Sequence, residues 1–176
     1  MIHSSNIAVV DLKQPPQRHV RVLVGQPTSS ADDWVVRDDL YFVKKLEVFR
    51  EQIRGIVVEA MQSTADMIIL PELSVPLECS DLLQNWSAQT GGVAVAGSHY
   101  HNSNGAYRSR CPIIIAGQIF FTEKLTPAPM EVSPVKGQGP SAGSVVHVFK
   151  HSRLGDFAVL VCSEREFYHS TNGWAR

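Results

Sequence analysis

The chain has 176 residues, a formal net charge of −1, and 44% hydrophobic and 19% charged residues. This length and composition are typical of one globular domain with a real core, and the charge gives no electrostatic case for a nucleic-acid partner or an anionic membrane surface. No apolar run approaches the ~20 residues of a membrane span, and the N-terminus lacks the basic and long apolar regions of a signal peptide. We therefore expect a cytoplasmic protein that binds neither nucleic acid nor membrane.

The three cysteines, Cys79, Cys111 and Cys162, are widely and irregularly spaced, which fits neither a disulfide framework nor a CxxC metal site. His99 and His101 form the one close histidine pair, and no second cluster at ligand spacing completes a zinc site. We therefore predict that the protein binds no metal and that these two histidines line a loop.

Residues 1–19 are predicted to be an irregular lead-in that Pro15 and Pro16 close, and residues 20–176 to form one domain. A first strand is expected over residues 19–26, where polar and apolar residues alternate before an apolar run. A helix is predicted over residues 38–62, because apolar residues recur there at steps of three and four. These residues are Phe42, Leu46, Phe49, Ile53, Ile56 and Ala60.

The next predicted strand covers residues 66–70 and stops at Pro71. Ser80 is predicted to cap a short helix that ends at Gly91 and Gly92. Composition predicts loops at residues 102–110 and 127–143, and the second loop is long enough to be functional. Further strands are expected over residues 93–97, 112–116, 118–122, 144–149 and 157–161.

One ionisable residue follows each of three apolar runs: Glu72, Lys124 and Cys162. A strand that is buried on both faces has no structural need for a charge or a reactive thiol at its end, whereas a catalytic pocket requires converging polar groups. A carboxylate, an ammonium and a thiol can serve as base, oxyanion stabiliser and nucleophile.

Each of these residues also has an ordinary interpretation. Cys162 can be a small core residue, Glu72 a surface carboxylate in a turn, and Lys124 a solvated lysine paired with Glu123. The sequence after Cys162 favours a role in catalysis, because it changes from a β run to a helix-compatible segment. The amides and dipole of a helix N-terminus lower the pKa of a thiol, and the Ser163 N–H would point toward an oxyanion.

Four segments, in this order, resemble the carbon–nitrogen hydrolase (nitrilase) superfamily over roughly residues 20–168: ADMIILPELSVP, GGVAVAGSHYHNSNGAYRSRCPIII, FFTEKLTP and VLVCSE. The resemblance implies an α/β (α+β) fold, an α-β-β-α sandwich, in which a strand, a turn and a strand precede the lysine motif. It also implies a catalytic triad of Glu72, Lys124 and Cys162. Glu131 is similar to a second glutamate that positions the lysine and substrate, and Glu164 to an acidic residue near the nucleophile.

A thiol-dependent hydrolase of non-peptide carbon–nitrogen bonds is the activity that this resemblance implies. Its substrate would be a small amide, or less readily a nitrile, processed through a thioester without a cofactor, and the chain would pair as a homo-oligomer or with a partner domain. Family members normally continue well past the cysteine, so we expect this domain to be C-terminally short, and Ser163 replaces a bulkier residue. The alternative is a nitrilase-like binding or signalling domain, a fragment of a larger multidomain protein, without catalysis. If the three residues lay far apart, a plain α/β domain with an unrelated pocket would be favoured.

Overall fold

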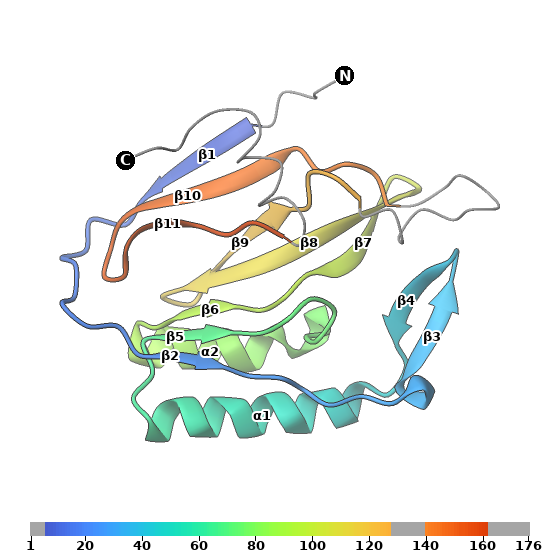
Figure 1. The fold of residues 1–176 in the computed structure, drawn as a ribbon, viewed down its shortest axis with the longest axis horizontal. Coiled ribbons are helices and arrows are strands. Elements are labelled where there is room, and N and C mark those ends of the chain that lie inside the picture. The colour runs from blue at the N-terminus through green and yellow to red at the C-terminus, as the bar shows by residue number, and fades with distance from the viewer. Residues whose placement is uncertain (1–5, 128–139, 162–176) are drawn as a thin grey trace.

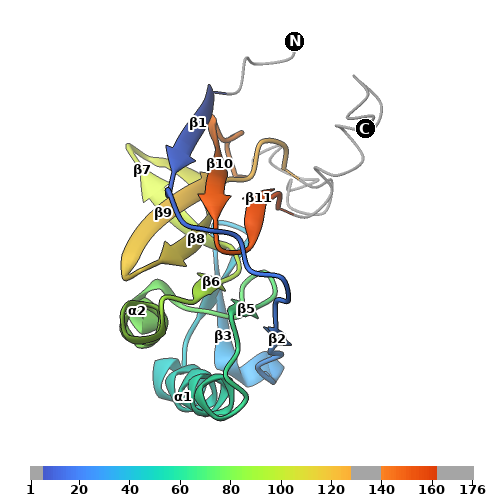
Figure 2. The same ribbon diagram turned by 90° about the vertical axis from the view of Figure 1, so that its left-hand side faces the viewer.

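The computed structural model describes residues 6–127 and 140–161. Two helices, α1 (Leu46–Gln62) and α2 (Ser80–Thr90), form one layer, and two sheets are stacked above them (Figure 1). The same order of helix, sheet and sheet is visible after a 90° turn (Figure 2). No helix among the described residues is long and apolar enough to cross a membrane.

The first sheet lies against the helices and contains β2 (Val22–Val24), β5 (Met67–Ile69), β6 (Val93–Val95), β7 (His99–Ser103), β8 (Ala106–Ile115) and β9 (Gln118–Glu123). Its strand order is β2-β5-β6-β8-β7, with β9 also paired to β8. The first three strands are parallel, and β8 is antiparallel to β6, β7 and β9. Strands β5, β6 and β9 therefore run in the same direction, and their carboxyl ends meet at one edge of the sheet.

The helices are held to this sheet by an apolar core that includes Phe49 and Ile53 of α1 and Leu83 and Trp86 of α2. Helix α1 follows the predicted apolar periodicity from Leu46 onward. Helix α2 ends as predicted, at Gly91 in the left-handed conformation. The prediction that Ser80 caps α2 is wrong, because Ser80 lies inside the first turn and its buried hydroxyl makes no hydrogen bond in the described part of the chain.

The second sheet contains β1 (Asn6–Asp11), β10 (Val145–Ser152) and β11 (Gly155–Ala158) in the order β1-β10-β11. Phe149 of β10 packs with Val93, Ile113 and Ile115 of the first sheet, so a second core joins the two sheets. The described residues thus form the helix, sheet and sheet layers of the expected sandwich. Residues 6–11 were predicted to be irregular, but they form β1 and pair in parallel with β10. A short strand whose partner lies far along the chain has little in its own sequence that predicts the pairing.

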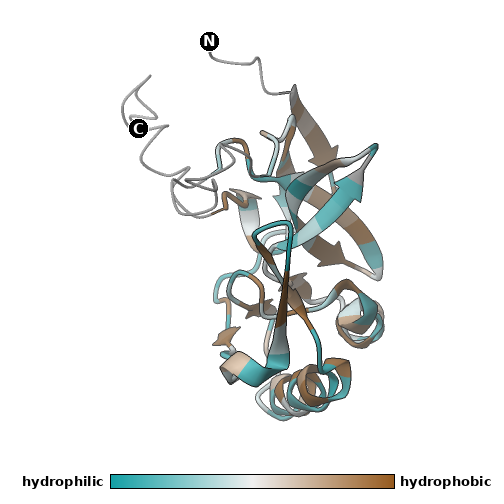
Figure 3. Ribbon diagram, turned by 90° about the vertical axis from the view of Figure 1, so that its right-hand side faces the viewer, coloured by the Kyte–Doolittle hydropathy of each residue, from teal (hydrophilic) through white to brown (hydrophobic). Residues whose placement is uncertain are grey.

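The predicted helix over residues 38–62 is wrong in its first part. β3 (Trp34–Arg37) and β4 (Leu40–Val43) form a hairpin, and Asp38 and Asp39 make its turn with φ of 50° and 63°. Phe42 contacts the rings of Tyr100 and Tyr107, at centroid distances of 6.0 and 5.5 Å. The hairpin stands in front of the layers in Figure 3, with a hydrophilic tip. Short 3-10 helices precede β3 and α2, at Ala31–Asp33 and Leu77–Cys79.

Residues 102–110 were predicted as a loop from composition, and the structure corrects this. They belong to β7, a tight turn at Asn104 and Gly105, and the start of β8. His99 and His101 therefore lie on a strand and not in a loop. The polar composition that predicted a loop reflects the first half of β8, residues 106–110, which is mostly only partly buried. The observed strand, turn and strand are those that the family resemblance implied.

Candidate active site

Glu72 and Lys124 meet where the carboxyl ends of β5 and β9 share an edge of the first sheet. Lys124 Nζ donates a hydrogen bond to Glu72 Oε1 at 3.3 Å, and the lysine side chain is 2% exposed against 34% for the glutamate. Lys124 is therefore not the solvated lysine of the ordinary interpretation. Burying an ammonium is unfavourable unless it is paired, and Glu72 provides the opposite charge. The Glu72 side chain is partly exposed and lines a cavity.

Ser98 is a second donor to the same carboxylate oxygen, which the motifs do not reveal. The buried Ser98 follows β6, and its Oγ donates to Glu72 Oε1 at 3.0 Å. The backbone N–H of Leu73 donates to the Ser98 carbonyl oxygen at 2.7 Å, so the two loops are joined by main chain as well. The available signal was topological: β5 and β6 are adjacent and parallel, so residues just after them lie side by side.

Gly97 permits this close approach of the two loops. Its φ is +67°, and a Cβ built on it would lie 1.9 Å from the Pro71 carbonyl oxygen. Any side chain at this position would push the Glu72 loop away from Ser98. Leu73 also has a left-handed φ, of 60°, which is uncommon for a branched residue. The backbone around Glu72 is thus tightly constrained before any ligand binds.

Glu123 holds the other half of the site in place. Its carboxylate is 5% exposed and accepts from Arg108 at 3.1 Å, Arg110 at 3.2 Å and the Ser144 N–H at 2.9 Å. Burial alone would raise the pKa of Glu123, but the Ser144 N–H and the two guanidinium groups outweigh it and hold the pKa below its ordinary value. The Lys124 N–H donates to the Ser109 carbonyl, and its carbonyl accepts from Gly143. The backbone of the lysine is therefore fixed from both sides.

A cavity of about 530 Å³ opens beside Glu72 and Ser98. It lies between β5 and β6 of the first sheet on one side and the segment 154–161 on the other. Its remaining lining is formed by Val20, Met67, Ile69, Leu70, Val95, Gly97, Cys111, Leu154, Phe157, Ala158, Val159, Leu160 and Val161. This volume is within the range of small-molecule sites.

The other predicted site residues, Glu131, Cys162, Ser163 and Glu164, lie outside the residues that the structure describes. Val161, which directly precedes Cys162, is 6% exposed and lines the same cavity as Glu72. The structure thus brings Glu72 and Lys124 together. It also places Val161, the residue before Cys162, in the lining of the cavity that Glu72 lines.

The described cysteines, Cys79 and Cys111, and the described histidines are not grouped as metal ligands. Within residues 6–127 and 140–161, no three His, Cys, Asp or Glu side chains are grouped as metal ligands would be. Cys79 ends the 3-10 helix before α2 and is buried in the core, and this burial raises the pKa of its thiol. His99 makes no hydrogen bond through either ring nitrogen to the described residues, and burial lowers its pKa to about 4. It is a neutral imidazole near neutral pH.

The fold is similar to that of three solved enzyme structures. An amidase from Nesterenkonia sp. matches 86% of this chain and 58% of its own, with a TM-score of 0.60 and 18% identity. The NitN amidase from Neterenkonia sp. AN1 matches 86% of this chain and 60% of its own, with a TM-score of 0.58 and 18% identity. The glutamine-dependent NAD+ synthetase from Acinetobacter baumannii, in complex with ADP, matches 70% of this chain and 26% of its own, with a TM-score of 0.51 and 20% identity.

This chain therefore spans less than two thirds of the length of each of these structures. No protein-family model matches the sequence, and no curated protein matches it. At these identities the likeness concerns the fold. Together with the layers and the order of elements, it shows that the chain has the nitrilase-type fold that its motifs resemble.

Proposed function

We propose that the protein hydrolyses non-peptide carbon–nitrogen bonds, amides in preference to nitriles, through Glu72, Lys124 and Cys162. One observation carries this proposal: a buried lysine lies 3.3 Å from the carboxylate of Glu72, and Glu72 lines a cavity together with Val161, the residue before Cys162. A buried charge whose partner lines a cavity is typical of a catalytic site. The shared fold with two amidases supports amides as the substrate class.

In the first half of the proposed reaction, Glu72 accepts the proton of the Cys162 thiol and the thiolate attacks the amide carbon. Lys124 and the Ser163 N–H stabilise the negative charge that develops on the amide oxygen. Glu72 then donates its proton to the departing nitrogen as the carbon–nitrogen bond breaks. The products of this half are ammonia, or an amine, and a thioester on Cys162.

In the second half, Glu72 removes a proton from a water molecule, which attacks the thioester carbon. Breakage of the carbon–sulfur bond releases the carboxylic acid and returns the proton to the cysteine. No cofactor takes part in this scheme. Glu131 and Glu164 are proposed to position the lysine and the substrate. Assembly as a homo-oligomer or with a partner domain, and a cytoplasmic location, stay predictions.

The decisive experiment measures ammonia release from butanamide together with the intact mass of the protein. Cys162→Ala is expected to abolish the covalent adduct, and Glu72→Gln to lower kcat/KM by at least about 10²-fold, as loss of a general base does. Cys79→Ala and Glu59→Gln are matched controls, because Cys79 lies away from the cavity and Glu59 is exposed on α1. Both controls are expected to retain full activity.

A reactive thiol is an independent readout of the same proposal. We expect Cys162 to be alkylated faster than Cys79 and Cys111 near neutral pH, because a catalytic thiol is more readily ionised. Equal rates, together with no ammonia release and no adduct from a folded sample, would refute the proposal. They would favour a nitrilase-like binding or signalling domain without catalysis.

A further inference from the structure

We infer that the cavity beside Glu72 takes an extended, uncharged hydrocarbon chain, so that the preferred substrates are amides of linear aliphatic acids. The inference rests on the proposed function for the amide end of the substrate. The chain-binding part is carried by the chemistry and shape of the cavity alone.

The chemistry of the lining favours an uncharged substrate tail over a charged one. Among its described residues, Glu72 is the one ionisable group besides the thiol of Cys111, and Ser98 already donates to Glu72. The other lining residues are apolar or glycine. A carboxylate or ammonium on a tail that lies against this lining would lose part of its hydration without gaining a counter-charge from a lining residue, which is unfavourable. Methylene groups would replace water against this lining and gain free energy.

The shape of the cavity favours a linear chain over a compact group. Val22 of β2 is opposite Met67 of β5, so Val20 lies near the amino end of β5. Leu154 is at the same end, because the neighbouring Arg153 binds Asp66 just before β5. Glu72 follows the other end of β5. A cavity that Val20, Leu154 and Glu72 all line therefore extends along the strand for about 15 Å, at the rise of a β-strand.

Binding can be measured without turnover in the Cys162→Ala protein. Calorimetric titration with butanamide, hexanamide and octanamide is expected to show an affinity gain of about threefold to fourfold for each added methylene. Suberamic acid has the same chain as octanamide but ends in a carboxylate. It is expected to bind at least about tenfold more weakly than octanamide, since its carboxylate would leave water for a lining of apolar side chains.

Val20→Phe fills the far end of the cavity and is expected to remove most of the gain from hexanamide to octanamide, while butanamide binding is kept. Val36→Phe is the matched control, because Val36 is 56% exposed on the hairpin. Leu154→Phe blocks the same end from the opposite wall and serves as the second variant if Val20→Phe does not fold.

The outcomes separate this inference from the proposed function. Equal affinity across chain lengths, or equal binding of suberamic acid and octanamide, overturns the inference even if the wild-type protein releases ammonia from all of them. Chain-length-dependent binding that Val20→Phe abolishes supports the inference even if no ammonia is released. In that second case the proposed hydrolysis is what fails.

Discussion

At the scale of single residues, the Oε1 atom of Glu72 accepts hydrogen bonds from two buried donors that belong to different strand ends. Lys124 provides charge and Ser98 provides a neutral hydroxyl, at 3.3 and 3.0 Å. Both bonds hold the carboxylate in one orientation, which a general base requires. Glu72 also lines the cavity, so this oriented carboxylate lies beside the space for a substrate.

Ser98→Ala is expected to lower kcat/KM for amide hydrolysis by about tenfold or more, because a hydrogen bond to a charged group contributes about 1.5–3 kcal/mol. Ammonia release measures this effect, with the exposed Ser29→Ala as the matched control. The thermal midpoint of Ser98→Ala is expected to fall by several degrees relative to the control, because the same buried hydrogen bond also stabilises the fold. An unchanged kcat/KM would mean that Lys124 alone orients the carboxylate.

His99 is expected to make the stability of the protein depend on pH. Burial, with a smaller contribution from His101, lowers its pKa from 6.5 to about 4. Between these two pH values the unfolded chain binds a proton at His99 that the folded protein does not bind. The free energy of unfolding therefore has its full value above pH 6.5 and decreases as the pH falls toward 4. At pH 5 the loss is about 2 kcal/mol relative to pH 7.

Urea unfolding at pH 7 and pH 5 measures this loss. His99→Phe keeps a ring of similar size but cannot be protonated, and it is expected to remove most of the difference between the two pH values. His19→Gln, at an exposed histidine, is expected to behave as the wild-type protein does. If His99→Phe and the wild-type protein lost the same stability, another group would be responsible.

At the scale of the elements, the site depends on contact between the loops that follow β5 and β6. Gly97→Ala is expected to lower the free energy of unfolding by at least about 3 kcal/mol, because it combines left-handed strain with a clash against Pro71. Gly105→Ala is the matched control. Its φ is +82°, but nothing lies within 4 Å of the added Cβ. The control is expected to lose about 1 kcal/mol, from strain alone.

Urea unfolding of both variants separates the clash from the strain. Gly97→Ala is also expected to lower amide hydrolysis, since the loop that carries Glu72 must move away from Ser98. Equal losses of stability in the two variants would show that the loops have room to adjust.

The sequence predicted the elements where local pattern and tertiary packing agree. Helix α1 from Leu46 onward and the buried strands around Met67 and Val93 have strong apolar patterns. The β3–β4 hairpin was missed because Phe42 falls at a helical step from Leu46, while its actual contacts are far along the chain. The meeting of Glu72 and Lys124 was predictable from the family resemblance. The Ser98 contact was not, because it requires knowing that β5 and β6 are neighbours.

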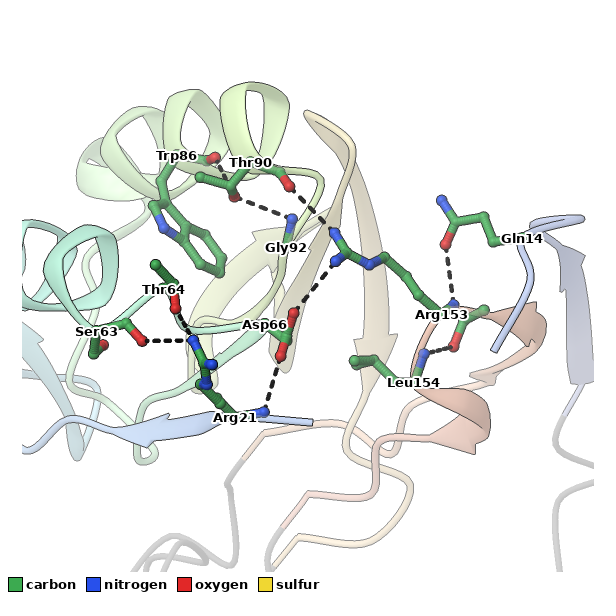
Figure 4. A network of polar contacts seen from close by, with 11 residues as sticks. Gln14, Arg21, Ser63, Thr64, Asp66, Trp86, Thr90, Gly92, Arg153 and Leu154 are labelled. Atoms are coloured by element: carbon green, nitrogen blue, oxygen red, sulfur yellow. Dashed lines mark hydrogen bonds and ion pairs between the residues drawn. The ribbon is translucent and has the colours of Figure 1, made fainter. Parts of the chain in front are cut away.

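At the scale of the whole molecule, one polar network ties the second sheet to the first (Figure 4). Arg153, in the turn between β10 and β11, donates to Asp66 at 3.3 Å and to the Thr90 carbonyl at 3.2 Å. Asp66 also accepts from the Arg21 N–H at 2.9 Å. This network fixes the turn from which the outer wall of the cavity begins, at the end opposite to Glu72.

Arg153→Leu is expected to lower the free energy of unfolding by about 2 kcal/mol, because it leaves the mostly buried Asp66 carboxylate without its charged partner. The side chains of the pair are 27% and 16% exposed. Arg54→Leu is the matched control, because its pair with Glu51 is 51% and 68% exposed and is worth less than about 0.5 kcal/mol. Urea unfolding measures both. Arg153→Leu, added to the Cys162→Ala protein, is expected to weaken octanamide binding more than butanamide binding. The reason is that Leu154, the next residue, lines the far end of the cavity. Equal losses in the two arginine variants would show that apolar packing around Phe149 alone holds the sheets together.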